Sequence, residues 1–182
     1  MEERIVILGE INEFFIAFCK YLISKELEVY VVLSKNQGLS KLKDIEEKIS
    51  LIKYNDEVDE IKFILTSIEP KIIYNLYGSI NNNDLKGLIE KFFLKNILLL
   101  EGLRESNNSL LINVIERTER DAEGKPLSIY TEIVDSLDKV NKFYRDNYKV
   151  KVRRKYRDEY ENTIKYYKKW NKYIFSNFFK IT

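Results

Sequence analysis

The sequence predicts an α/β fold in which a parallel sheet of five or six strands lies between two layers of helices. Short runs of aliphatic and β-branched residues alternate with longer segments that carry apolar residues at helical spacing. The first three segments, strand 4–8, helix 14–22 and strand 28–33, form a β-α-β unit, and such units build parallel sheets with right-handed crossovers. With 182 residues, the chain is long enough for one domain with a full core.

The later segments continue this alternation. In order, we expect helix 39–48, strand 49–53, helix 57–68, a strand that begins at Lys71, helix 84–105, strand 110–115 and helix 130–147. A basic run over 149–157 then leads into an aromatic-rich helix that ends near Phe178. We therefore predict one doubly wound domain over 1–152 and a helical extension over 153–182 that packs on it.

Composition excludes several classes of site. The net charge is only +2, from 31 basic and 29 acidic residues, so there is no global bias toward nucleic acid or membrane. The chain has no histidine and one cysteine, so we expect no metal site and no intramolecular disulfide. An apolar signal core and an apolar run of membrane-spanning length are both absent, and we therefore expect a cytoplasmic protein.

Three segments together resemble a known family, the short-chain dehydrogenase/reductase superfamily. The match is to its extended branch, the GDP-mannose 4,6-dehydratase-like epimerases and dehydratases that act on nucleotide sugars. The residues in register with the active-site helix of that branch are Pro126, Ser128, Tyr130, Asp138, Tyr144 and Tyr148. Segments 74–78 and 96–105 are similar to two further motifs of the branch. The resemblance covers residues 4 to 152, and it implies a Rossmann-like fold without the substrate-binding lobe.

The resemblance implies a catalytic role for Tyr130, with Thr118 as the hydroxyl that contacts substrate. In the family, a lysine four residues after the tyrosine lowers the pKa of the phenol, but here that position is Val134. A free phenol has a pKa of about 10 and is a poor base at neutral pH without a nearby cation. We therefore expect that this helix keeps the structure it has in the family but no longer supports proton transfer by the tyrosine.

The resemblance also implies a cofactor site at the ends of the strands. The residues that fall at it are Gly9, Asn12, Ser34, Lys35, Asn55, Asp56 and Gly78. Three replacements oppose binding: Phe15 stands where the third glycine is expected, Leu33 where an acidic residue holds the ribose, and Tyr77 where alanine is expected. We therefore expect that the chain binds no cofactor. If the pocket is still functional, the cofactor is expected to be NAD or NADP.

Four functions remain open. The leading one is a catalytically inactive, truncated relative that forms a homodimer, or a heteromer with an active nucleotide-sugar enzyme, through helices 84–105 and 130–147. The apolar residues expected at this interface are Ile89, Phe93, Leu100, Leu137, Val140 and Tyr144. The others are a module that binds a nucleotide or nucleotide sugar without turnover, an NAD(P)-dependent epimerase, dehydratase or reductase with an unusual active site, and a nucleic-acid binder. The last is disfavoured because acidic residues interrupt the basic tail.

Overall fold

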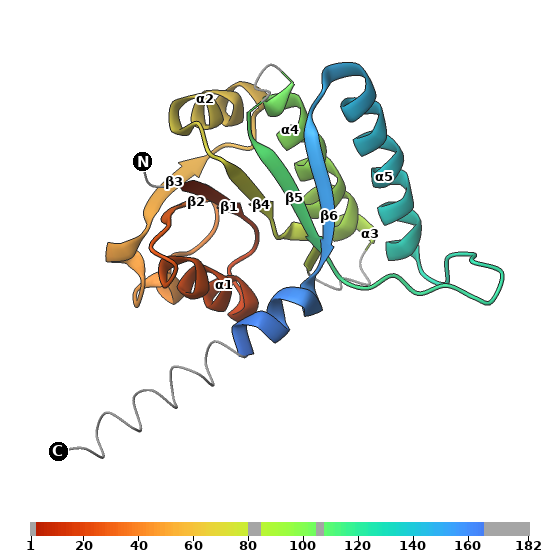
Figure 1. Ribbon diagram of the computed structural model, residues 1–182, viewed down its shortest axis with the longest axis horizontal. Coiled ribbons are helices and arrows are strands. Elements are labelled where there is room, and N and C mark those ends of the chain that lie inside the picture. Colours follow the sequence, from red (N-terminus) through yellow and green to blue (C-terminus); the bar gives the residue numbers. More distant parts are fainter. Residues whose placement is uncertain (1–2, 80–84, 105–107, 166–182) are drawn as a thin grey trace, which may run out of the picture.

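A single parallel sheet forms the middle of the computed structural model, which describes residues 3–79, 85–104 and 108–165 (Figure 1). Its strand order is β3-β2-β1-β4-β5-β6, and neighbouring strands are all parallel. The strands are β1 (Arg4–Leu8), β2 (Glu28–Ser34), β3 (Ser50–Tyr54), β4 (Ile72–Asn75), β5 (Leu110–Ile115) and β6 (Lys151–Tyr156). The doubly wound sheet predicted from the sequence is confirmed.

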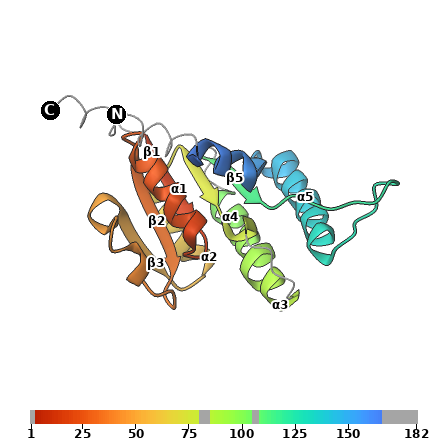
Figure 2. The same ribbon diagram turned by 90° about the horizontal axis from the view of Figure 1, so that it is seen from below.

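Helices cover both faces of the sheet (Figures 1 and 2). They are α1 (Glu13–Ile23), α2 (Val58–Ile68), the short α3 (Leu85–Gly87), α4 (Leu94–Leu103) and α5 (Ile129–Tyr148). Because side chains alternate along a strand, Val6 and Leu8 of β1 pack in the core shared with α2, α4 and α5, whereas Ile5 and Ile7 pack in the core shared with α1. The three-layer arrangement is therefore confirmed. In the described part of the chain, no helix has the length and apolar character needed to cross a membrane.

The prediction of one helix over 39–48 is wrong. The structure has two 3₁₀ turns there, η1 (Ser40–Leu42) and η2 (Glu46–Lys48). Leu42 and Ile45 are the buried side chains of this connection, and both pack in the core beneath α1. Three residues per turn places side chains at i and i+3 on one side, so these two anchors are satisfied without a longer helix.

Helix 84–105 is not continuous over its described part. A π-helical segment, η4 (Leu88–Phe93), separates α3 from α4. The wider turn still buries Leu88 and Phe92, and it places the Phe92 ring beside the exit of β4. The predicted end residues 84 and 105 lie outside the described residues.

The sheet extends beyond the domain boundary expected after Val152. That boundary falls inside β6, whose residues pair with β5 from Leu110↔Lys151 to Ile115↔Tyr156. Residues 157–165 are helical, and Tyr160 packs edge-on against Phe18 with ring centroids 5.1 Å apart. This segment therefore belongs to the layer that contains α1, and the rest of the expected aromatic helix lies outside the described residues.

Candidate functional site

The carboxyl ends of β1 to β5 form one edge of the sheet, and the residues predicted for a site follow these ends. In a doubly wound sheet this edge is where ligands bind. Gly9 follows β1, Ser34 ends β2, Asp56 follows β3 and Gly78 follows β4. Tyr130 joins them from the first turn of α5. The structure thus brings the predicted residues to a common edge.

The hydroxyl of Tyr130 is bonded to the backbone of two loops. Ser128 caps the start of α5, so the Tyr130 side chain points from the first turn toward the sheet. Its hydroxyl donates to the carbonyl oxygen of Gly78 at 2.8 Å and accepts from the amide of Glu116 at 2.9 Å. The ring stacks on Phe92 at a centroid distance of 6.1 Å, and only 6% of Tyr130 is exposed. The single donor of this phenol is therefore already used within the protein.

The environment of Tyr130 also opposes loss of its proton. Burial raises the pKa of the phenol above its usual value, and the hydrogen bond from the Glu116 amide offsets only part of that effect. Val134, one turn along α5, is buried and supplies no charge. The expected partner Thr118 is half-buried in the loop after β5 and is not one of the groups bonded to the Tyr130 hydroxyl.

The loop after β1 is packed closely rather than open. A Cβ atom on Gly9 would lie 2.8 Å from Cβ of Leu76 and 3.2 Å from Cδ2 of Phe15, whose ring is fully buried. Asn12 caps α1 by accepting the Phe15 amide at 2.9 Å, which occupies one N–H of the turn that would otherwise face an anion. The side-chain amide of Gln37 donates to the Gly9 carbonyl oxygen at 3.2 Å. Glycine is therefore needed here for close packing.

A compact polar cluster lies at the ends of β2 and β3. Ser34 donates to Asp56 at 2.7 Å, and Lys95 of α4 forms an ion pair with Asp56 and donates to Ser34 at 3.2 Å. The Lys95 ammonium also lies 5.4 Å and 5.9 Å from the ring centroids of Tyr54 and Tyr77. Sequence reasoning missed Lys95, because 61 residues separate it from Ser34 and no motif marks it.

Charge within this cluster is balanced internally. Burial disfavours the charged form of Asp56, but hydrogen bonds from Lys95 and Ser34 outweigh this and hold the pKa of its carboxyl below the usual range. Burial raises the pKa of the Tyr77 phenol to about 12, so this hydroxyl stays protonated at neutral pH. The cluster therefore presents a neutralised pair and two aromatic rings where a nucleotide would need free donors.

The other predicted residues at this edge also have protein partners. Asn55 bonds Glu60 of α2 through its backbone amide and its side chain. Lys35 contributes its backbone amide to the Tyr54 carbonyl at 2.9 Å. A Cβ on Gly78 would lie 2.6 Å from Cε2 of Phe92, so this position too is close-packed. No group of three or more His, Cys, Asp or Glu that could hold a metal ion occurs in the described ranges.

A hollow lies beside the loop after β1. It has a volume of about 350 Å³, and its lining residues are Glu10, Ile11, Gln37, Gly38, Ser40 and Lys41. The Glu10 carboxylate pairs with Lys91 at 2.7 Å. Apart from this ion pair, Lys41 is the cation among the lining residues, so the hollow has little positive charge for a pyrophosphate.

Comparisons with known proteins agree on the fold. No family model matches the sequence, and no curated protein matches it. Among solved structures, dTDP-glucose 4,6-dehydratase from Bacillus anthracis, in complex with NAD, has a TM-score of 0.65 at 15% identity over 85% of this chain and 54% of that one. UDP-glucose 4-epimerase from Thermotoga maritima, with UDP-glucose, has a TM-score of 0.66 at 14% identity over 83% and 54%.

A third similar structure is L-threonine dehydrogenase from Clostridium difficile, with a TM-score of 0.66 at 12% identity over 84% of this chain and 52% of that one. This chain thus spans about half the length of the solved structures it matches. The fold that the resemblance implied is confirmed: the chain has the Rossmann-like fold of these solved epimerase and dehydratase structures.

The bonds of Tyr130 predict a structural effect of removing its hydroxyl. We expect Tyr130→Phe to lower the free energy of unfolding by about 1–2 kcal/mol, because the buried Gly78 carbonyl loses a donor. Urea denaturation measures this change. The control is Tyr30→Phe, whose hydroxyl bonds Glu28 near the surface and should cost less than about 1 kcal/mol. Equal stability of parent and Tyr130→Phe would contradict a structural role for this hydroxyl.

The Asp56 cluster predicts a pH dependence of stability. An unfolded aspartate titrates near pH 3.9 and folded Asp56 titrates lower, so its contribution is present above about pH 4 and is lost as the pH falls through the folded pKa. In urea denaturation, the difference between parent and Asp56→Asn should be constant near neutral pH and shrink below about pH 4. A difference that does not change with pH would show that the cluster does not favour the charged carboxyl.

Proposed function

We propose that this chain is a non-catalytic member of the Rossmann-fold proteins that acts by protein association. The observation that carries the proposal is the double backbone bonding of the Tyr130 hydroxyl. For this phenol to transfer a proton to a substrate, it would have to leave Gly78, and its raised pKa disfavours the phenolate. The similar structures of epimerases and dehydratases bind NAD, and an NAD(P)-dependent epimerase, dehydratase or reductase with an unusual active site is the alternative.

The filled edge of the sheet supports the absence of a cofactor. Phe15 packs against Gly9, the Gln37 amide bonds the Gly9 carbonyl, and Lys95 neutralises Asp56. To bind a dinucleotide, the chain would have to break these contacts and approach a loop that carries Glu10. Binding of a nucleotide or nucleotide sugar without turnover is supported only by the hollow beside Glu10.

The surface for association lies on the layer of α4 and α5, which are neighbours in both views (Figures 1 and 2). Of the interface residues expected from the sequence, Leu100, Leu137 and Tyr144 are buried in the chain's own core, so that part of the expectation is wrong. Exposed apolar side chains on η4, α4 and α5 include Ile89, Leu94 and Phe143, of which Leu94 and Phe143 are 51% and 52% exposed. We assign the contact with a second copy to these side chains, with a heteromer as the other outcome.

Cofactor binding is tested by titration calorimetry. We expect no heat of binding with NAD or NADP, because Asn12 already occupies the Phe15 amide at the start of α1 and Asp56 already engages Lys95. UDP-glucose and GDP-mannose are titrated alongside. Micromolar binding of either dinucleotide would show that the packing around Phe15 opens, and turnover assays with Tyr130 as proton donor would then decide for the enzyme.

Association is tested by sedimentation velocity. We expect the parent to be dimeric and Phe143→Ser to raise the dissociation constant by about tenfold or more, because an exposed aromatic anchor is removed. The matched control is Phe63→Ser, which removes an equally large ring that is 73% exposed on a different helix, α2. A monomeric parent, or equal effects of the two variants, would count against this interface.

A further inference from the structure

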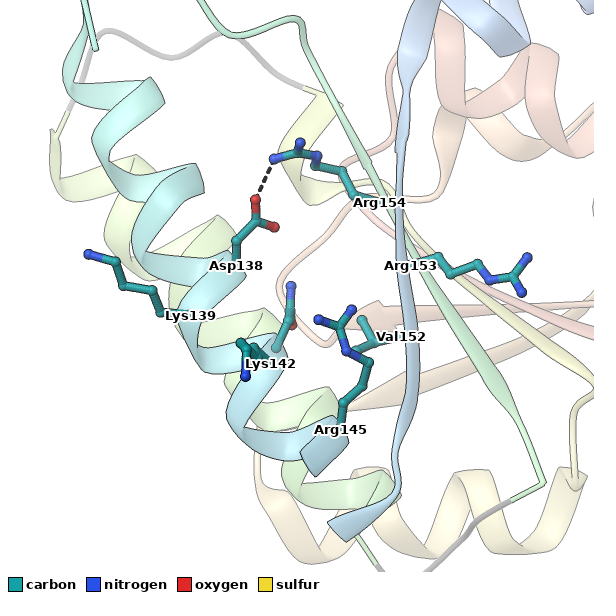
Figure 3. A pocket seen from close by; sticks show the side chains of 8 residues that line it. Asp138, Lys139, Lys142, Arg145, Val152, Arg153 and Arg154 are labelled. Carbon is teal, nitrogen blue, oxygen red and sulfur yellow. Dashed lines mark hydrogen bonds and ion pairs between the residues drawn. The ribbon is translucent and has the colours of Figure 1, made fainter. Parts of the chain in front are cut away.

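A second pocket lies between α5 and β6. Its volume is about 550 Å³, within the range of small-molecule sites. The lining residues are Asp138, Lys139, Asn141, Lys142, Arg145, Val152, Arg153 and Arg154 (Figure 3). None of them belongs to the strand-end site described above.

The lining of this pocket is strongly basic: five of its side chains are cationic and one is a carboxylate. Asp138 is neutralised by Arg154 at 2.5 Å, and Lys142 pairs with Asp146 at 2.7 Å. Arg145 has no hydrogen bond or ion pair from its side chain within the described residues. The pocket therefore carries an excess of positive charge that the chain itself does not balance.

The cations differ in where they point (Figure 3). Arg145 extends from α5 along β6 beside Val152, and Arg154 reaches from β6 to Asp138 on α5. Lys139 and Arg153 project away from the space between the two elements. The two guanidinium groups that remain, Arg145 and Arg154, are planar forks of N–H donors, which suit a phosphate better than an ammonium does.

Asn141 adds a buried amide to the same wall. Only 6% of this residue is exposed, and its Oδ1 atom is buried without a hydrogen-bond partner in the described part of the chain. Because Oδ1 is inaccessible, the polar atom that can face the pocket is Nδ2, which can donate two hydrogen bonds. Leu137 and Tyr144 on the same side of α5 are core residues, so an apolar side chain would suit position 141 better for stability. Nδ2 has no hydrogen bond within the described residues either, and Asn141 lines the pocket, so this donor is available to a ligand there.

We propose that this pocket binds a small phosphomonoester. The phosphate oxygens accept from Arg145, from the N–H groups of Arg154 that Asp138 leaves free, and from Nδ2 of Asn141. Every one of these groups is a donor, which selects an anionic acceptor over a neutral one. The volume far exceeds that of a phosphate group, so an organic portion with hydroxyl groups fills the rest of the space between α5 and β6.

The test is titration calorimetry on the full chain at fixed ionic strength, with glycerol 3-phosphate, inorganic phosphate and glycerol as probes. We expect glycerol 3-phosphate to bind, inorganic phosphate to bind more weakly, and glycerol not to bind. Arg145→Gln and Asn141→Leu should each weaken binding of glycerol 3-phosphate by about tenfold, as loss of one charge-assisted or buried donor implies.

Arg153→Gln is the matched control. Like Arg145→Gln, it removes one arginine charge, but the Arg153 side chain lies on β6 and points away from the space between α5 and β6. It should change the affinity by less than about twofold at physiological salt, where charges at a distance are screened. Asn141→Leu should keep or raise the thermal unfolding temperature, since it removes an unpartnered buried oxygen, so its loss of affinity is separable from unfolding.

Three results would overturn the proposal. If glycerol 3-phosphate does not bind, the pocket is not a phosphomonoester site. Equal binding of inorganic phosphate and glycerol 3-phosphate would leave an anion site without the organic portion. An equal effect of Arg153→Gln and Arg145→Gln would assign the binding to the basic edge strand as a whole, as an acidic peptide beside β6 would require.

Discussion

The hydroxyl of Tyr130 ties together the elements on which the edge of the sheet depends. It bonds the chain after β4, at Gly78, and the chain after β5, at Glu116, and it does so from the first turn of α5. The Glu116 amide also donates to the Gly78 carbonyl at 3.2 Å, so three groups share one small network. Phe92 closes the network from the π-helical segment. A phenol held in this way orders two loops, and that role competes with proton transfer.

Close packing of large side chains recurs along this edge. Phe15 and Tyr77, which depart from the family pattern, are both buried, and burial of a large aromatic ring contributes about 1.5–3 kcal/mol. Lys95, on helix α4, neutralises the negative charge of Asp56 through an ion pair. The side chains that depart from the family pattern are thus ones whose burial stabilises the domain.

A buried asparagine network positions α4 against the sheet. Oδ1 of Asn113 on β5 accepts from Asn75 of β4 at 2.9 Å and from Asn96 of α4 at 2.5 Å. Asn75 in turn accepts the amide of Tyr77 and so directs that ring into the core. Buried amides are costly unless paired, so these bonds restrict how the helix can sit on the strands.

The sequence by itself determined the order of strands and helices and the mismatch of Tyr130 with Val134, because apolar periodicity and motif spacing are local properties. Local pattern was insufficient at 39–48, where two buried anchors three residues apart suit a 3₁₀ turn as well as a helix. Only the tertiary structure decided that Leu137 and Tyr144 face the core, that Lys95 reaches Asp56, and that pairing of β6 with β5 forms a basic pocket against α5. These contacts join residues distant in the chain, and their partners are set by how the layers pack.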